Sequence, residues 1–313
     1  MLRKHPPIYL FAAFASLILA PFQPGLTARA VTDIPTTDPL VQGIVTQDVE
    51  AAGYFQQGVL NYNQRDLDGA ILAFRKALER DPRIAMAYYY LGNLFNEKGR
   101  TEEAITEYRR AISINPNLAD AYYNLGVIYY QKGQLDEASD AYDKALGVNP
   151  DYANAYYNLG LILYQQNRRD EAIVAYKQVI RLNPNNAGAY YNLGIALEQS
   201  GDFAGATEAY RKAVALNPNS ANAQNMLANI LTRQNRNEEA IATYRVAIRS
   251  QPNDVNAYYN LGVLLYYQNQ FQEAISPLKR ARDLYRSQGN LDKAAEINDL
   301  IQQIDLLRKQ QRT

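Results

Sequence analysis

Few residues of this chain belong to the types that usually carry out catalysis or hold a metal. The sequence has one histidine, His5, and no cysteine among its 313 residues. We expect His5 to be removed with an export signal, so that the mature chain has neither imidazole nor thiol. This predicts the absence of Ser-His and Cys-His catalysis, of zinc sites built on His or Cys, and of the usual general base near neutral pH.

Adjacent carboxylates are the remaining candidates for acid and base chemistry, as in Glu102-Glu103 and Asp136-Glu137. Both pairs fall where we expect a helix to begin, and the helix dipole favours acidic side chains at that end. The sequence also has no glycine-rich phosphate loop. We therefore predict that the protein is not an enzyme and has no catalytic, cofactor-binding or metal-binding residues.

One short stretch recurs through the chain. AYYNLG begins at Ala121, Ala155, Ala189 and Ala257, so neighbouring copies are separated by 34 residues or twice that number. Prolines and alanines keep the same interval, namely Pro82, Pro116, Pro150, Pro184, Pro218 and Pro252, and Ala70, Ala104, Ala138, Ala172, Ala206, Ala240 and Ala274. A fixed period of this length is typical of a stacked array of structural repeats.

Each repeating unit is predicted to be a hairpin of two helices. When positions are counted from Ala119, apolar or small residues recur at helical spacings in two runs, Tyr122, Leu125, Gly126 and Tyr129, then Ala138, Tyr142 and Ala145. Gly133 marks the turn between the runs. The second helix is expected to end at Asn149, because a residue before proline is disfavoured in the helical conformation.

Gly126 lies inside the first of these helices, although glycine costs roughly 1 kcal/mol relative to alanine there. A residue without a side chain lets another helix approach closely. We therefore expect Gly126 to be a packing position, with Ala138 of the second helix as its neighbour.

These positions resemble the tetratricopeptide repeat. An aromatic residue stands at position four, Leu-Gly at seven and eight, Ala at twenty, an aromatic residue at twenty-four, Ala at twenty-seven and Pro at thirty-two. The resemblance covers residues 51–288 and implies an all-α solenoid that forms a right-handed superhelix of seven repeats, 51–84, 85–118, 119–152, 153–186, 187–220, 221–254 and 255–288.

Three repeats depart from the pattern. The first has Gln57 where leucine is expected, and the seventh lacks the closing proline and carries Pro277 inside its second helix. Terminal repeats are often atypical because they cap the stack. The sixth repeat is internal, yet it carries Gln224, Met226 and Ala228, so a local distortion or a specialised contact is expected there.

The two ends of the chain differ from the repeats. Residues 289–313 are predicted to form a capping helix, with an apolar stripe of Leu291, Ala294, Ala295, Ile297, Leu300, Ile301 and Ile304. Residues 1–30 have the basic start, short apolar run and small-residue site of a secretory signal peptide, and residues 31–50 follow as a linker that leads into the first helix. An uncleaved, membrane-attached form is the alternative. We expect export to the periplasm, or to the thylakoid lumen of a photosynthetic bacterium.

Removal of the signal peptide changes the charge of the chain. The full sequence has 32 basic and 32 acidic residues, and the loss of Arg3, Lys4 and Arg29 leaves 29 basic residues and a net charge of minus three. This balance is not typical of a protein that binds nucleic acid or an anionic membrane surface.

The uncharged face of the first helices is the candidate binding surface. In the tetratricopeptide family this face lines a concave groove, and the resemblance implies the same here. We call positions five and six of the repeats, with tyrosines at position twelve, the ladder: Tyr89, Tyr123, Asn124, Tyr130, Tyr157, Asn158, Tyr164, Tyr191, Asn192, Tyr259, Asn260 and Tyr266. Tyrosine offers rigid contact area, and asparagine matches the hydrogen-bonding groups of a peptide backbone. We therefore predict a scaffold or adaptor that binds an extended segment of another protein, for the assembly of an envelope or membrane complex.

Several alternatives remain open from the sequence. Each asparagine could instead bond to the neighbouring hairpin. A glycan-associated role, or an accessory role in a glycosyltransferase or polysaccharide-export system, is the second functional hypothesis. Family members that grip an acidic tail use Lys or Arg on this face, and their absence from positions two, five and six of the middle repeats argues against that role. The oligomeric state and the identity of the partner stay open.

Overall fold

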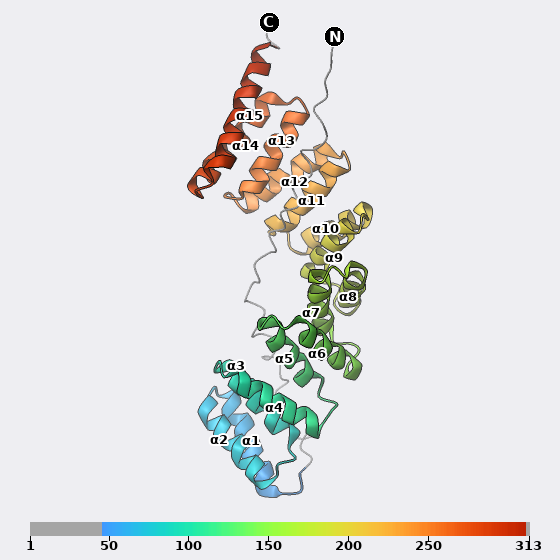
Figure 1. The fold of residues 1–313 in the computed structure, drawn as a ribbon, viewed down its shortest axis with the longest axis vertical. Helices are drawn as coiled ribbons and strands as arrows, with labels where there is room; N and C mark the ends of the chain where they lie inside the picture. Colours follow the sequence, from blue (N-terminus) through green and yellow to red (C-terminus); the bar gives the residue numbers. More distant parts are fainter. Residues whose placement is uncertain (1–45, 311–313) are drawn as a thin grey trace.

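The computed structural model describes residues 46–310 of the chain. Within this range the regular structure consists of fifteen α-helices. They form an elongated stack with α1 and α2 at one end and α15 at the other (Figure 1). The prediction of an all-α solenoid of helical hairpins is confirmed. The predicted signal peptide, most of the linker and the last three residues lie outside the described residues.

The helices alternate regularly between the first and the second member of a hairpin. The first helices are α1 (Val49–Asn63), α3 (Ala85–Glu97), α5 (Ala119–Gln131), α7 (Ala153–Gln165), α9 (Ala187–Gln199), α11 (Ala221–Arg233) and α13 (Val255–Tyr267). The second helices are α2 (Leu67–Arg80), α4 (Thr101–Ile114), α6 (Leu135–Val148), α8 (Arg169–Leu182), α10 (Phe203–Leu216), α12 (Asn237–Ser250) and α14 (Phe271–Ser287). The helix α15 (Leu291–Gln310) follows the last hairpin. Each helix packs mainly against the helices next to it in the chain, as in other solenoids.

The turn inside each hairpin depends on one residue at position fifteen. Gly99, Gly133 and Gly201 adopt a positive φ there, and so do the non-glycine residues Arg65 and Asn167. Glycine and asparagine tolerate this left-handed conformation better than other residues. The predicted role of Gly133 as the turn residue is confirmed.

The helix glycine at position eight makes room for an aromatic ring and not for Ala138. A Cβ atom placed on Gly126 would lie 2.6 Å from the ring of Tyr142, which supplies its three nearest atoms. Gly160 and Gly194 meet Tyr176 and Tyr210 at 2.7 and 2.5 Å in the same way. The predicted neighbour was therefore wrong, because the bulky residue at position twenty-four, and not the alanine at position twenty, fills the space above the glycine.

The two ends of the stack are closed differently. At the first end, α1 presents Gln57 and Asn61, whose side chains hydrogen-bond to each other at 2.7 Å, beside the exposed side chains of Tyr54 and Leu60. At the other end α15 packs on α14, which continues through Pro277 to Ser287. In α15 the buried stripe consists of Ala294, Ile297, Ile301 and Ile304, whereas the predicted stripe residues Leu291 and Ala295 are exposed.

Candidate functional site

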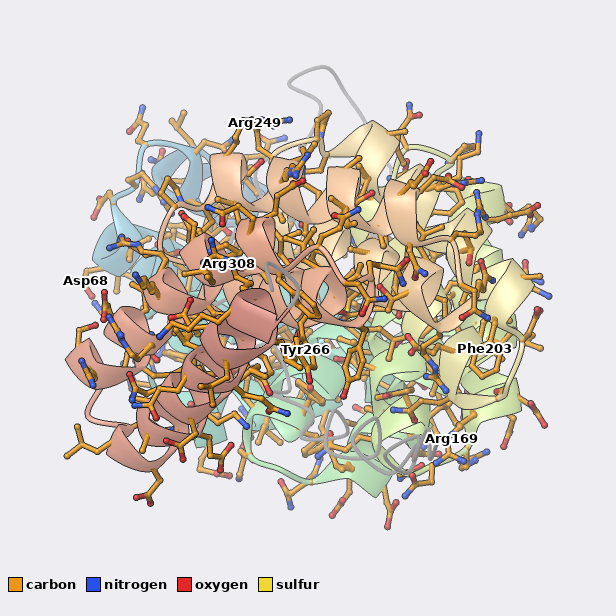
Figure 2. All side chains as sticks on the ribbon, turned by 90° about the horizontal axis from the view of Figure 1, so that it is seen from above. Asp68, Arg169, Phe203, Arg249, Tyr266 and Arg308 are labelled. Atoms are coloured by element: carbon orange, nitrogen blue, oxygen red, sulfur yellow. The ribbon has the colours of Figure 1, made fainter. Side chains whose placement is uncertain are left out.

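The ladder residues lie on the first helices α3, α5, α7, α9 and α13. Their side chains are half-buried, except for Asn260, which is buried with 8 % of its surface exposed. In the view along the stack, Tyr266 lies near the middle of the molecule, whereas Asp68, Arg169 and Arg249 lie toward its edge (Figure 2). The first helices thus turn at least this position toward the interior of the superhelix.

The ladder asparagines of the middle repeats bind back to the preceding repeat. Asn158 donates through Nδ2 to the hydroxyl groups of Tyr123 and Tyr142, at 3.3 and 3.2 Å. Asn192 donates to the hydroxyl of Tyr157 at 3.0 Å. The alternative that these asparagines join neighbouring hairpins is therefore seen in the structure, and each amide is held in one orientation.

A different partner holds the asparagine at two other junctions. Asn93, at position nine of the second repeat, accepts through Oδ1 from the hydroxyl of Tyr108 at 2.6 Å and from Nδ2 of Asn124 at 3.0 Å. The same arrangement, with the same distances, recurs between the sixth and seventh repeats in Asn229, Tyr244 and Asn260. Sequence reasoning missed Asn93 and Asn229. The signal was an asparagine at position nine, where the middle repeats carry Val127, Leu161 and Ile195.

The carbonyl oxygens of the middle asparagines are left available. No group in the described residues donates to Oδ1 of Asn124, Asn158 or Asn192, and these atoms are not among the buried polar atoms without a partner. Each of these side chains is therefore held by a hydrogen bond from Nδ2, while its Oδ1 accepts no hydrogen bond from the described residues. Such fixed acceptors could receive N–H groups from a bound chain without first losing rotamer freedom.

Four of the ladder tyrosines at position five keep neutral hydroxyl groups. Burial raises the pKa of Tyr123, Tyr157 and Tyr191, and that of Tyr89 is raised further by burial and by the nearby charge of Asp120. Hydrogen bonds from asparagine oppose the shift in Tyr123 and Tyr157 only in part. These side chains act as neutral hydrogen-bonding and stacking groups at physiological pH.

At position twelve the ladder tyrosines have more varied surroundings. The hydroxyl of Tyr164 is buried without a hydrogen-bond partner among the described residues, and burial raises the pKa of Tyr130. Tyr266 packs against Phe271 with ring centroids 5.9 Å apart. In the seventh repeat, the ammonium group of Lys293 on α15 lies 5.1 Å from the ring centre of Tyr259. The last helix therefore contacts one end of the ladder.

The prediction of a wholly uncharged face is wrong at the junction of the fifth and sixth repeats. Glu198, at position twelve, is 14 % exposed and forms a 2.8 Å ion pair with Arg233 of the next repeat. Its second oxygen accepts from the hydroxyl of Tyr210 at 3.0 Å. Arg233 also lies over the ring of Phe203 at 4.5 Å. The two charges compensate each other within the face.

Across residues 46–310, no group of three or more His, Cys, Asp and Glu side chains is placed to hold a metal ion. No helix in that same range is long and apolar enough to cross a membrane.

The fold and the ladder define a class of protein, the solenoids of stacked helical hairpins. A family model described as the "Cilia and flagella-associated protein 70 C-terminal domain" matches residues 38–257, and a tetratricopeptide repeat model matches residues 243–276. The chain belongs to the tetratricopeptide repeat family. A comparison with curated protein sequences gave no match.

Several solved structures are similar to this chain. YrrB, described as a tetratricopeptide repeat protein with an unusual peptide-binding site, is 26 % identical with a TM-score of 0.55, covering 61 % of this chain and 97 % of its own. PilF of Pseudomonas aeruginosa is 25 % identical with a TM-score of 0.54, over 69 % and 97 %. A repeat protein of Parabacteroides merdae, at 17 % identity and a TM-score of 0.52 over 79 % and 99 %, shows the fold alone.

These neighbours indicate a protein–protein interaction scaffold. Proteins of this family are generally non-catalytic, and they act by binding other proteins.

Proposed function

We propose that the protein is an exported, non-catalytic scaffold that holds an extended segment of a partner protein along the ladder, for the assembly of an envelope or membrane complex. The observation that carries the proposal is the set of three asparagines with nitrogen fixed and oxygen free. YrrB, which is similar over more than half of this chain, is described as having a peptide-binding site, and this supports a peptide as the ligand.

Binding would rest mainly on the backbone of the partner. An extended chain presents N–H groups along its length, and successive repeats present the Oδ1 acceptors of Asn124, Asn158 and Asn192. Half-buried tyrosines at position five add rigid contact area with a polar tip. Because neither element reads a particular side chain, the middle of the ladder would tolerate many partner sequences.

Export is part of the proposal and rests on the pattern of residues 1–30. A secretory signal of this kind is removed after the small-residue site, which would leave a mature chain beginning at residue 31. The intact mass of the protein isolated from the native host tests this directly. A mass that includes residues 1–30 would favour the membrane-attached form instead.

The binding proposal is tested with the mature chain and a triple variant, Asn124→Ala, Asn158→Ala and Asn192→Ala. Each protein is used to capture partners from the native envelope, and peptides from the captured protein are then titrated. We expect the triple variant to lose capture and peptide binding while its helical spectrum is retained. A matched control replaces three exposed residues of the second helices, Asp143, Lys177 and Glu208, with alanine.

Equal binding by the wild type and the asparagine variant would contradict the proposal and move the site to another face. Loss of binding in the control as well would point to a general loss of stability. The urea midpoint of each variant, measured beside its affinity for the peptide, distinguishes loss of the binding site from loss of stability.

A glycan-associated role is the second candidate, and one cavity favours it. A hollow of about 350 Å³ lies between α4, α5 and α6, with Tyr122 and Tyr129 in its wall and Glu137, Asp140 and Lys144 beside them. Aromatic surface next to charged and polar groups suits a sugar ring. Binding of oligosaccharides that is lost in Tyr122→Ala but kept in the triple asparagine variant would support this role and not the peptide proposal.

A further inference from the structure

The ladder is interrupted at the sixth repeat. Asn225 and Met226 occupy positions five and six, where the middle repeats carry tyrosine and asparagine. Asn225, Asp254 and Asn260 are each only 8 % exposed. The sixth repeat therefore replaces a half-exposed aromatic side chain with a small, buried amide.

Asn225 makes different contacts from the tyrosines that it replaces. In the third repeat, Tyr123 stacks on Tyr152 with ring centroids 4.8 Å apart, and its hydroxyl accepts from Asn158 of the next repeat. Asn225 instead donates through Nδ2 to Oδ2 of Asp254, which occupies the position of Tyr152. The amide is too short to take the place of the phenol hydroxyl beside the next asparagine.

Two carbonyl oxygens at this junction lack a hydrogen bond. Oδ1 of Asn225 and Oδ1 of Asn260 are buried and have no partner within the described residues. Nδ2 of Asn260 is already engaged with Asn229. A buried acceptor without a donor is unfavourable, so the junction is suited to a group that brings N–H donors.

Asp254 brings a negative charge next to Asn225. Its Oδ1 accepts from the backbone N–H groups of Asn256 and Ala257 at 3.0 and 3.1 Å, at the start of α13. Its Oδ2 accepts only from the neutral amide of Asn225. No basic side chain of the described residues forms an ion pair with Asp254, so a positively charged donor is favoured over a neutral one.

We propose that the junction of the sixth and seventh repeats receives a basic side chain of the bound segment, lysine or arginine, whose N–H groups donate to Oδ1 of Asn225 and Oδ1 of Asn260 beside Asp254. This inference rests on the proposed function of the ladder. The middle repeats hold the backbone of the partner, and this junction fixes its register. Because both oxygens are shielded from solvent, the basic group enters as neighbouring side chains move. The unbranched side chain of Met226, at position six, can change rotamer easily.

The test uses the mature chain and peptides with the same uncharged serine and alanine background and one central residue, which is lysine, norleucine or glutamate. The uniform background lets each peptide slide until its central residue meets the preferred junction. Affinities are measured by fluorescence anisotropy. We expect the lysine peptide to bind about tenfold more tightly than the norleucine peptide, and the glutamate peptide to bind more weakly than both.

Two variants separate the subsite from the rest of the ladder. Asn225→Tyr restores the side chain of the other repeats, and Asn225→Leu keeps a similar volume without an acceptor. Both are expected to abolish the preference for lysine while the norleucine peptide binds as before. A preference that survives in both variants would overturn the inference.

The remaining outcomes separate this inference from the proposed function. Equal binding of lysine and norleucine peptides to the wild type would overturn the subsite and leave the backbone ladder standing, as expected if a water molecule satisfies the two oxygens. Failure of all three peptides to bind would overturn both proposals.

Discussion

The middle repeats and the sixth repeat form the same helical hairpin with different residues at positions five, six and eight. In the third, fourth and fifth repeats a glycine at position eight lies under a buried tyrosine ring, and tyrosine and asparagine fill positions five and six. In the sixth repeat Ala228 stands at position eight and is fully buried, while Asn225 and Met226 fill the ladder positions. The hairpin fold survives all of these exchanges, whereas the hydrogen bonds between repeats do not.

The difference shows where the fold is tolerant and where it is specific. Helix α11 starts and ends at the same positions as its counterparts α5, α7 and α9, although it carries Gln224, Asn225, Met226 and Ala228 where they carry Tyr, Tyr, Asn and Gly. The hydrogen bonds between repeats differ: Asn158 donates to tyrosine hydroxyls, while Asn260 donates to Asn229. Repeat architecture therefore depends on apolar spacing, and the surface that a partner would meet depends on individual polar residues.

The largest expected effect that tests this comparison is alkaline unfolding. Burial raises the pKa of Tyr142, Tyr176 and Tyr210 well above the ordinary value, and raises that of Tyr90 to about 12. Because folding favours the neutral phenol, these residues contribute full stability below their unfolded pKa of about 10, and the contribution is lost as the pH rises through the folded values. We expect tyrosinate absorbance and loss of the helical spectrum to appear together above about pH 11.

A variant sharpens this prediction. Tyr142→Phe removes one buried phenol and should move the alkaline midpoint upward. Titration of the tyrosines at their ordinary pKa, without loss of helix, would show that the middle repeats do not depend on neutral hydroxyl groups.

The second effect concerns position eight, where the two regions should respond in opposite ways to side-chain size. Gly160→Val places methyl groups against the ring of Tyr176, where even a Cβ would lie 2.7 Å away, and we expect a loss of about 3 kcal/mol in the free energy of unfolding. Ala228→Gly removes a methyl group from a helix that already accommodates it, with an expected loss of about 1 kcal/mol. Urea denaturation of both variants measures the two values.

A smaller loss in Gly160→Val than in Ala228→Gly would mean that Tyr176 moves aside easily. The close contact between glycine and tyrosine would then be a tolerated feature and not a requirement of the middle repeats.

An effect smaller than that of Gly160→Val concerns the asparagine at position nine, which accepts hydrogen bonds in both the second and the sixth repeats. Asn229→Val introduces the residue type of Val127, and it removes the acceptor for the hydroxyl of Tyr244 and for Nδ2 of Asn260. We expect a loss of about 1 to 2 kcal/mol, because partly buried donors are left without a partner. The urea midpoint measures the loss, and Val127→Ala serves as a control for packing at the same position. No change in stability would indicate that water replaces Asn229 fully.

Most of the fold could be predicted from the sequence, because the repeat period and the spacing of apolar residues depend on each helix alone. The hairpins, the turn at Gly133, the position of Pro277 inside the last second helix and a final helix all followed from that pattern. The stripe of α15 was only partly right, since Leu291, at its first residue, is 66 % exposed. The repeat limits, the signal peptide and the ladder as a binding site stay predictions.

The candidate site was less accessible to sequence reasoning. The side chain of asparagine can both donate and accept hydrogen bonds. In the structure, the nitrogen of the asparagine at position six donates to the preceding repeat, whereas its oxygen accepts no hydrogen bond from the residues that the structure describes. Glu198 and Arg233 each occur in only one repeat, so an analysis of the residues that the repeats share did not identify them. Their pairing depends on which side chains of successive repeats meet.

The sequence by itself determined that this protein is an all-α array of hairpins with no histidine or cysteine in its repeats and with an unusual sixth repeat. These properties are local, since period, propensity and composition can be read one helix at a time. Only the tertiary structure decided that Gly126 lies under Tyr142, that the ladder asparagines are anchored by the preceding repeat, and that the side-chain oxygens of Asn225 and Asn260 lack donors. The physical reason is that hydrogen bonds and close contacts between repeats depend on the distance and angle between neighbouring helices, which no single repeat specifies.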